Sequence, residues 1–176
     1  PLVVAVGTPI ANVYAWNKTP VTAMFKGADT ASGIAYCVPD KVLLTEGSSQ
    51  TVSGYCLDYA GLSSTRTLAV NIDTTAPSVL YTKVPAANEY GWNGGSVTVK
   101  FTCADTMSGV RSCPSDISFA GEGVNISTST TVYDYADNSR TVSVAGINID
   151  KTLPVSSASL TGTYKNGGYS SAVSFT

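Results

Sequence analysis

VKFTCADTMSGVRSC (residues 99–113) repeats the pattern of AMFKGADTASGIAYC (residues 23–37), so one short stretch occurs twice in the chain. The similarity continues on both sides at a constant separation of 76 residues. A fixed period of this kind indicates tandem copies of one structural unit. The matched pairs are Trp16 and Trp92, Phe25 and Phe101, Asp29 and Asp105, Gly33 and Gly109, Cys37 and Cys113, Glu46 and Glu122, and Asp58 and Asp134.

A closing phrase marks the end of each copy. NIDTTAP (71–77) corresponds to NIDKTLP (148–154), one residue further along because of an insertion near Gly146. The phrase places repeat 1 at residues 1–77, repeat 2 at residues 78–154, and the start of a third, incomplete repeat at residues 155–176. We interpret the chain as part of a longer array. The alternative is a complete subunit whose last segment is completed by strands of a neighbouring copy.

The pattern within each repeat is that of β-strands. Residues 97–103 alternate between apolar and polar side chains, as in a strand that is buried on one face. Clusters of Gly, Asn, Asp, Ser and Pro interrupt the apolar segments at short intervals and indicate tight turns. No amphipathic helical stretch competes with this interpretation. We therefore predict an all-β chain in which each repeat is a two-sheet antiparallel β-sandwich of about seven strands.

Composition excludes several kinds of partner. Charged residues make up 12% of the chain, the net charge is −2, and no cluster of Lys and Arg occurs. We therefore expect no binding of nucleic acid or of anionic membranes, both of which need a basic surface. The apolar content of 43% is sufficient for ordinary cores. No apolar run approaches the roughly 18 residues of a spanning helix, so we expect no membrane insertion in this segment.

The four cysteines occupy three aligned positions, and each repeat fills two of them. Four cysteines allow three connectivities. Cys37 and Cys113 lie at equivalent points of successive repeats, too far apart for a disulfide, which favours pairing within each repeat. We predict Cys37 with Cys56 and Cys103 with Cys113, and the alternative is four free thiols. Disulfides persist in oxidising surroundings, which indicates an extracellular or cell-surface location.

The sequence offers little for catalysis. Histidine is absent, which removes the commonest general base and a frequent zinc ligand. Neither a G-x-S-x-G motif nor a phosphate-binding loop occurs. The carboxylates mostly recur in both repeats, and a chain seldom needs one active site in each structural copy. We expect no enzyme in this segment, no catalytic residue and no cofactor.

Calcium is the one candidate ligand. Asp29 and Asp105 each lie in the pattern A-D-T-x-S-G, where a carboxylate typically accepts backbone N–H bonds in a turn. The alternative is that these residues combine with Asp73 or Asp150, at the ends of the repeats, to bind calcium near a joint. Two N-glycosylation sequons, at Asn17 and Asn125, are candidate modification sites.

The combined motifs resemble the bacterial immunoglobulin-like repeats of large secreted and cell-surface proteins. The resemblance lies in residues 97–116, the Glu122-Gly123 turn, residues 134–138 and residues 149–154, and more loosely in residues 21–77. It implies immunoglobulin-like sandwiches that serve in adhesins, stalks and filaments.

We predict a structural role, in which disulfide-stapled sandwiches in series form a rigid extracellular rod. The expected partners are neighbouring copies of the repeat, within the chain and between chains of a homopolymer. Two alternatives remain: an adhesive module that binds glycan or protein, and a spacer attached to a secreted enzyme.

Overall fold

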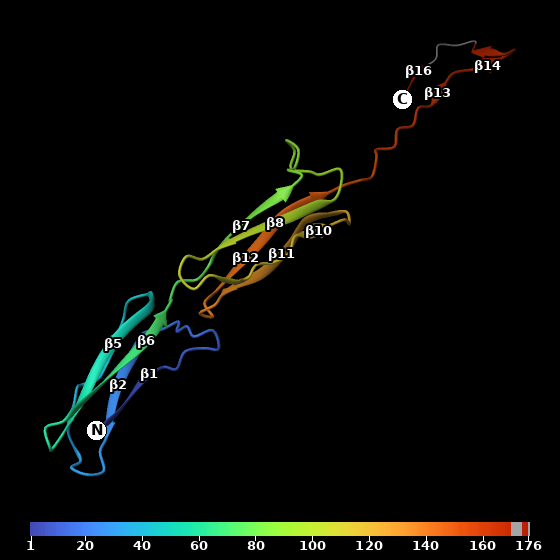
Figure 1. The fold of residues 1–176 in the computed structure, drawn as a ribbon. Helices are drawn as coiled ribbons and strands as arrows, with labels where there is room; N and C mark the ends of the chain where they lie inside the picture. Colours follow the sequence, from blue (N-terminus) through green and yellow to red (C-terminus); the bar gives the residue numbers. More distant parts are fainter. Residues whose placement is uncertain (170–173, 176) are drawn as a thin grey trace.

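The computed structural model describes residues 1–169 and 174–175. Two sandwiches lie end to end, and the chain leaves the far end of the second as an extended segment (Figure 1). Below, residues 1–77 are called unit 1 and residues 78–154 unit 2. In the part of the chain that the structure describes, no helix has the length and hydropathy needed to cross a membrane.

Unit 1 is built of two three-stranded antiparallel sheets, with strand orders β1-β2-β4 and β3-β5-β6. Alternation decides which face of each strand is buried: Val21, Ala23 and Phe25 of β2 face the core, and Lys26 faces solvent. The strands are β1 (Leu2–Thr8), β2 (Val21–Ala28), β3 (Ile34–Cys37), β4 (Lys41–Leu43), β5 (Gly47–Asp58) and β6 (Ser63–Ile72).

Unit 2 repeats this architecture, with the sheets β10-β8-β7 and β12-β11-β9. Its core contains Val97, Val99 and Val144, all of which are fully buried. The chain is therefore all-β and made of antiparallel β-sandwiches, which confirms the predicted fold class. The strands are β7 (Ser78–Val84), β8 (Val97–Ala104), β9 (Val110–Ser112), β10 (Ile117–Phe119), β11 (Gly123–Asp134) and β12 (Ser139–Ile149).

Each sandwich has six strands rather than about seven. The loop between β1 and β2 meets β6 through a single parallel bridge between Asn17 and Ile72, and unit 2 has the corresponding bridge between Asn93 and Ile149. The contact is a single bridge in each unit, so this loop does not form a seventh strand.

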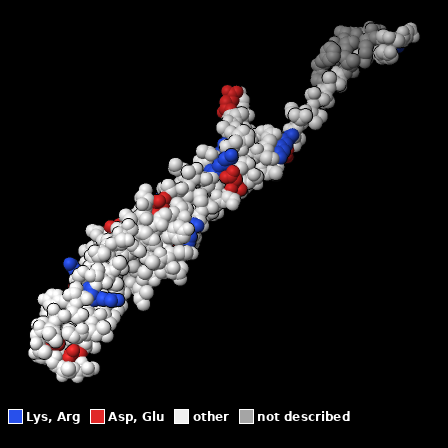
Figure 2. All heavy atoms as spheres, in the orientation of Figure 1, with Lys and Arg blue, Asp and Glu red and all other residues white. Residues whose placement is uncertain are grey.

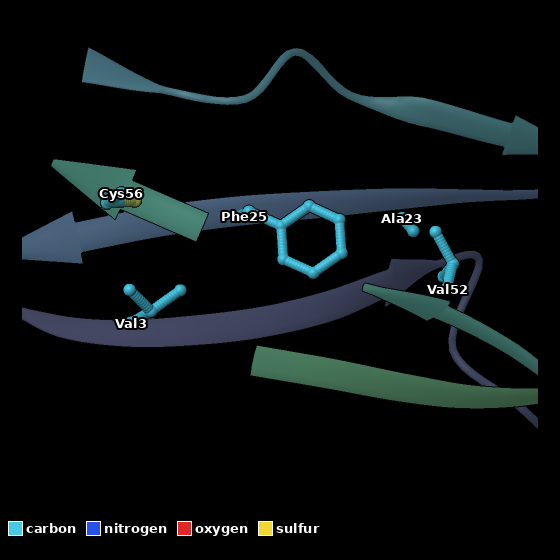
Figure 3. Close-up of a cluster of buried hydrophobic side chains, with 5 residues drawn as sticks. All are labelled: Val3, Ala23, Phe25, Val52 and Cys56. Carbon is cyan, nitrogen blue, oxygen red and sulfur yellow. The ribbon is translucent and has the colours of Figure 1, made fainter. Parts of the chain in front are cut away.

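The core of unit 1 lies between the two sheets (Figure 3). Phe25 is at its centre, and Val3, Ala23, Val52 and Cys56 pack around it.

A glycine in the facing strand makes room for the Phe25 ring. A Cβ on Gly54 would lie 2.4 Å from the ring carbons of Phe25, closer than any real contact. The ring therefore packs directly on the backbone of β5.

Both predicted disulfides are present, but they join different parts of the sandwich. Cys37 and Cys56 are directly opposite each other on β3 and β5, so this bridge lies within one sheet. Cys103 on β8 bonds to Cys113, which follows β9, and this bridge connects the two sheets. The two disulfides therefore connect different pairs of strands in otherwise matching units.

The predicted third repeat is described only in part. Two short antiparallel pairs are present, β13 with β16 and β14 with β15. The predicted residues 170–173 and 176 lie outside the described part of the chain. These strands are β13 (Leu160–Thr161), β14 (Tyr164–Lys165), β15 (Gly168–Tyr169) and β16 (Ser174–Phe175).

Candidate functional site at the joint between the units

The linker between the two units is short and held at several points. β6 ends at Ile72 and β7 begins at Ser78. The backbone N–H of Asp73 donates to the carbonyl of Asn17 at 2.9 Å. The Glu46 carboxylate accepts hydrogen bonds from Thr74 and Thr75. These contacts fix the direction in which the chain leaves unit 1.

Side chains of unit 2 bind this linker directly. Asn138 Nδ2 donates to the carbonyl oxygens of Asp73 at 2.8 Å and Thr75 at 3.3 Å. Arg140 Nε donates to the carbonyl oxygen of Pro77 at 2.9 Å. The linker thus has hydrogen-bond partners in both units, and we call this contact region the joint.

A second contact lies beside the linker. Asn12 Nδ2 in unit 1 donates to the carbonyl oxygen of Tyr135 and to Asp137 Oδ2, both at 2.8 Å. The Tyr14 ring meets the Tyr135 ring edge-on, with centroids 5.1 Å apart.

Arg111 of unit 2 also takes part in this second contact. Its guanidinium lies 5.5 Å from the Tyr14 ring centroid and 5.2 Å from that of Tyr133, within the range of cation–π attraction. It also forms an ion pair with Asp137. The Tyr14 contact connects Arg111 to unit 1, whereas Tyr133 and Asp137 belong to unit 2.

Three carboxylates meet inside the joint. Asp73 comes from unit 1, Asp105 follows β8, and Asp134 is the last residue of β11. One oxygen of each lies within 4.8 Å of the others. A point equidistant from three such oxygens lies at most about 2.8 Å from each, slightly beyond the calcium–oxygen distance of roughly 2.4 Å, so one ion could contact all three after a small side-chain adjustment.

Burial opposes the ionised form of these carboxyl groups, and the backbone N–H groups of Thr75 and Ser108, which donate to Asp73, partly compensate for it. Asp73 and Asp134 are 0% exposed. Burial raises the pKa of Asp134 above its ordinary value, hydrogen bonds from Asn138 offset part of the effect, and the charge of Asp73 adds to it. Like charges at this distance repel strongly where water is excluded. A cation would relieve the repulsion.

The predicted calcium candidates separate into two groups. Asp73 and Asp105 come together, whereas Asp29 and Asp150 do not join them. Asp29 lies at the opposite end of unit 1, and Asp150 is exposed at the far end of unit 2 and accepts the backbone N–H of Thr152. Calcium binding was not attributed to Asp134 from the sequence. Its recurrence as the pair Asp58 and Asp134 was the one available signal.

The turn role predicted for the A-D-T-x-S-G pattern is present in both units. Asp29 Oδ1 accepts the backbone N–H groups of Ala31, Ser32 and Gly33, and these bonds, that of Ser32 foremost, lower its pKa to about 2. Asp105 Oδ1 accepts those of Met107 and Gly109. The turn uses Oδ1 of Asp105, and the second carboxylate oxygen makes no hydrogen bond within the turn.

The two sequons differ in accessibility. Asn17 is 6% exposed and its Nδ2 donates to the carbonyl oxygen of Asn71, so a glycan could not be attached without opening the fold. Asn125 is exposed, and modification there stays a prediction.

Comparison with known proteins adds a fold-level likeness only. No protein-family model matches the sequence, and no curated protein matches it. Among solved structures, the chain is similar to the fibronectin(III)-like modules of Clostridium thermocellum CbhA, with 12% identity over 83% of this chain and 94% of that chain, and a TM-score of 0.40. At these values the similarity carries no argument about function. The all-β assignment rests on the strands and sheets described above.

Proposed function

We propose that this chain is a structural module in which β-sandwich units in series form a stiff extracellular rod. The observation that carries the proposal is the joint, where unit 2 binds the linker through Asn138 and Arg140 and grips unit 1 through Arg111. Neighbouring domains move relative to each other by default unless their contact is extensive or specific. A linker with partners on both sides favours a fixed angle.

The disulfides support the location. Two bridges in 176 residues are typical of proteins that fold and work outside the reducing cytoplasm. Each bridge closes a loop of 10 to 19 residues and stabilises its unit by about 3 kcal/mol. Such units tolerate the mechanical load and the proteases met outside a cell.

We further propose that calcium occupies the joint between Asp73, Asp105 and Asp134. Calcium takes six to eight oxygen ligands, so water or carbonyl oxygens would complete a set begun by three carboxylates. Because Asp73 belongs to unit 1 and the other two belong to unit 2, a bound ion would couple the units and stiffen the rod.

Thermal unfolding of the full chain tests the calcium site. Calcium at about 100 times its Kd should stabilise the chain by about 2.7 kcal/mol, and EGTA should reverse the increase in Tm. Asp134→Asn should remove the response because it removes one ligand charge. The matched variant Asp58→Asn, at the same position of unit 1, should retain it. A Tm that does not change with calcium or EGTA would exclude the calcium site. It would not contradict the proposal that the units form a rod.

Electron microscopy of the native material tests the rod. A 12-residue strand such as β5 or β11 spans about 40 Å at roughly 3.3 Å per residue. We expect straight particles with an axial repeat of roughly 35 to 45 Å. Particles that bend freely at every unit would contradict the proposal.

A further inference from the structure

Unit 1 has a pocket of about 410 Å³ on the side of the sandwich where the edge strands β1 and β6 face each other. Most of its lining is aliphatic and includes Ala5, Ile10, Leu68 and Ala69. Among the described residues that line it there is no Lys, Arg, Asp or Glu. The volume lies within the range of small-ligand sites.

The equivalent position in unit 2 carries a lysine. Lys83 on β7 extends to the facing edge strand, where its Nζ donates to the carbonyl oxygens of Ala145 at 2.6 Å and Gly146 at 3.1 Å. In unit 1 this position is Gly7. The strand registers establish the equivalence, because Gly7 pairs with Ala23 and Lys83 pairs with Val99, each 76 residues later.

The pocket therefore results from a missing side chain. A Cβ on Gly7 would point inward, 3.1 Å from Val21 Cγ1 and 3.5 Å from Leu68 Cδ2. Leu68 corresponds to the smaller Val144, since both lie opposite equivalent residues of the neighbouring strand. Unit 1 thus has Gly7 where unit 2 has a lysine, and Leu68 where unit 2 has a valine. The pocket lies beside these two residues.

One buried acceptor without a partner lines this pocket. Asn17 is 6% exposed, and its Oδ1 has no hydrogen-bond partner. Asn93 Oδ1 is in the same state in unit 2, where Lys83 bonds the backbone instead. In unit 1 the unpaired oxygen adjoins an open pocket, and a hydrogen-bond donor is the group that it lacks.

We propose that the unit 1 pocket binds a primary alkylammonium group, of the kind carried by a lysine side chain or by a free amine. The aliphatic stem would lie along the apolar walls, and the ammonium would donate to Asn17 Oδ1 and to backbone carbonyls of β6. Lys83 with the Ala145 carbonyl, the counterpart of the Ala69 carbonyl, is the internal template for this geometry, whereas the Gly146 carbonyl belongs to the one-residue insertion of unit 2. This site would allow the proposed rod to bind another molecule. The inference does not depend on calcium binding at the joint.

Titration of the full, isotope-labelled chain with n-butylammonium chloride, followed by amide NMR, tests the proposal. The expected result is saturable shifts at Gly7, Ala69 and Val70. The donor-free control n-butyltrimethylammonium should bind at least tenfold more weakly, because it has no N–H group. Nα-acetyl-lysine methylamide forms the second arm: binding of this probe indicates a protein lysine as the natural source, and binding of the amine alone indicates a small amine.

Reciprocal variants locate the binding. Lys83→Gly should empty the equivalent place in unit 2 and create a second set of shifts, around Ala145. Gly7→Lys combined with Leu68→Val should fill the unit 1 pocket and abolish the shifts there. Because that double variant could unfold, its circular dichroism melt is recorded, and Lys83→Gly supplies an independent answer.

Three results would overturn the proposal. They are equal binding of the amine and its trimethylated analogue, shifts confined to other surfaces, and failure of Lys83→Gly to gain any response.

Discussion

Gly27 and Cys103 occupy the same position in the two units, and their difference decides where each disulfide forms. A Cβ on Gly27 would lie 2.9 Å from Cys56 Cβ, Cys56 Sγ and Ile34 Cδ1. The Cys37–Cys56 bridge therefore occupies the space that the Cys103 side chain uses in unit 2. The two arrangements exclude each other within one unit.

Gly27→Ala tests this exclusion. We expect a loss of about 1–3 kcal/mol in the free energy of unfolding, because a disulfide cannot move aside for the added methyl group. Gly94→Ala is the matched control, since a Cβ there has nothing within 4 Å, and it should be nearly neutral. Chemical denaturation of both variants gives the comparison. Equal effects would contradict the steric account.

At the scale of elements, one glutamate in each unit holds the outgoing chain. Glu46 accepts the backbone N–H of Thr74 at 2.8 Å, and Glu122 accepts that of Lys151 at 2.7 Å. Hydrogen bonds, first from the Thr74 hydroxyl, lower the pKa of Glu46 below its ordinary value of 4.5. The backbone N–H of Lys151 is the leading cause of the same shift in Glu122.

These shifts predict the pH dependence of stability. A carboxyl whose pKa is lower in the folded state stabilises the fold above about pH 4.5, and this contribution is lost as pH falls through the folded-state pKa. We therefore expect Tm to fall between about pH 5 and pH 3. The double variant Glu46→Gln, Glu122→Gln should show a shallower fall.

The control for this experiment is Glu89→Gln, which changes an exposed glutamate that is not one of the two carboxylates bound to the outgoing chain. It should reproduce the pH profile of the unchanged chain. A double variant with that same profile would show that the linker contacts do not depend on the carboxylate charge.

At the scale of the whole molecule, the two units are not interchangeable. Unit 2 contacts unit 1 through Arg111, Asp137, Asn138 and Arg140. The corresponding residues of unit 1 do not carry these groups. They are Ala35, Gly61, Leu62 and Ser64. Joints along a longer array of such units would accordingly differ in stiffness.

Transferring unit 1 residues into unit 2 tests the stiffness of the joint. In the triple variant Arg111→Ala, Asn138→Leu, Arg140→Ser, the distribution of distances between the units should widen roughly two-fold, because domain motion is the default without specific contacts. Double electron–electron resonance between spin labels on cysteines introduced at Ser48 and Ser115 measures this distance distribution. Arg66→Ala, on an exposed strand position of unit 1, is the control. Unchanged widths would contradict a joint held by these side chains.

Much of the architecture could be predicted from the sequence, for physical reasons that act locally. Alternation of apolar and polar residues selects strands, and the 76-residue period defines the copied unit. The pairing of cysteines follows from the same period, because equivalent positions of successive units are far apart. The number of strands could not be predicted as accurately, because the single bridge between Asn17 and Ile72 depends on how a loop packs.

The site and the pocket needed the tertiary structure. Asp134 joins Asp73 and Asp105 only because the joint brings residues 29 to 61 positions apart in the chain into contact, and no local pattern encodes that distance. In the sequence, Gly7 cannot be distinguished from any other strand glycine. In the structure it lies near Leu68 and lacks the side chain that Lys83 has in unit 2, and a pocket is present there. The sequence by itself determined the strands, the period and the staples, because these depend on residue type and spacing. Only packing decided which charges and which empty spaces face each other.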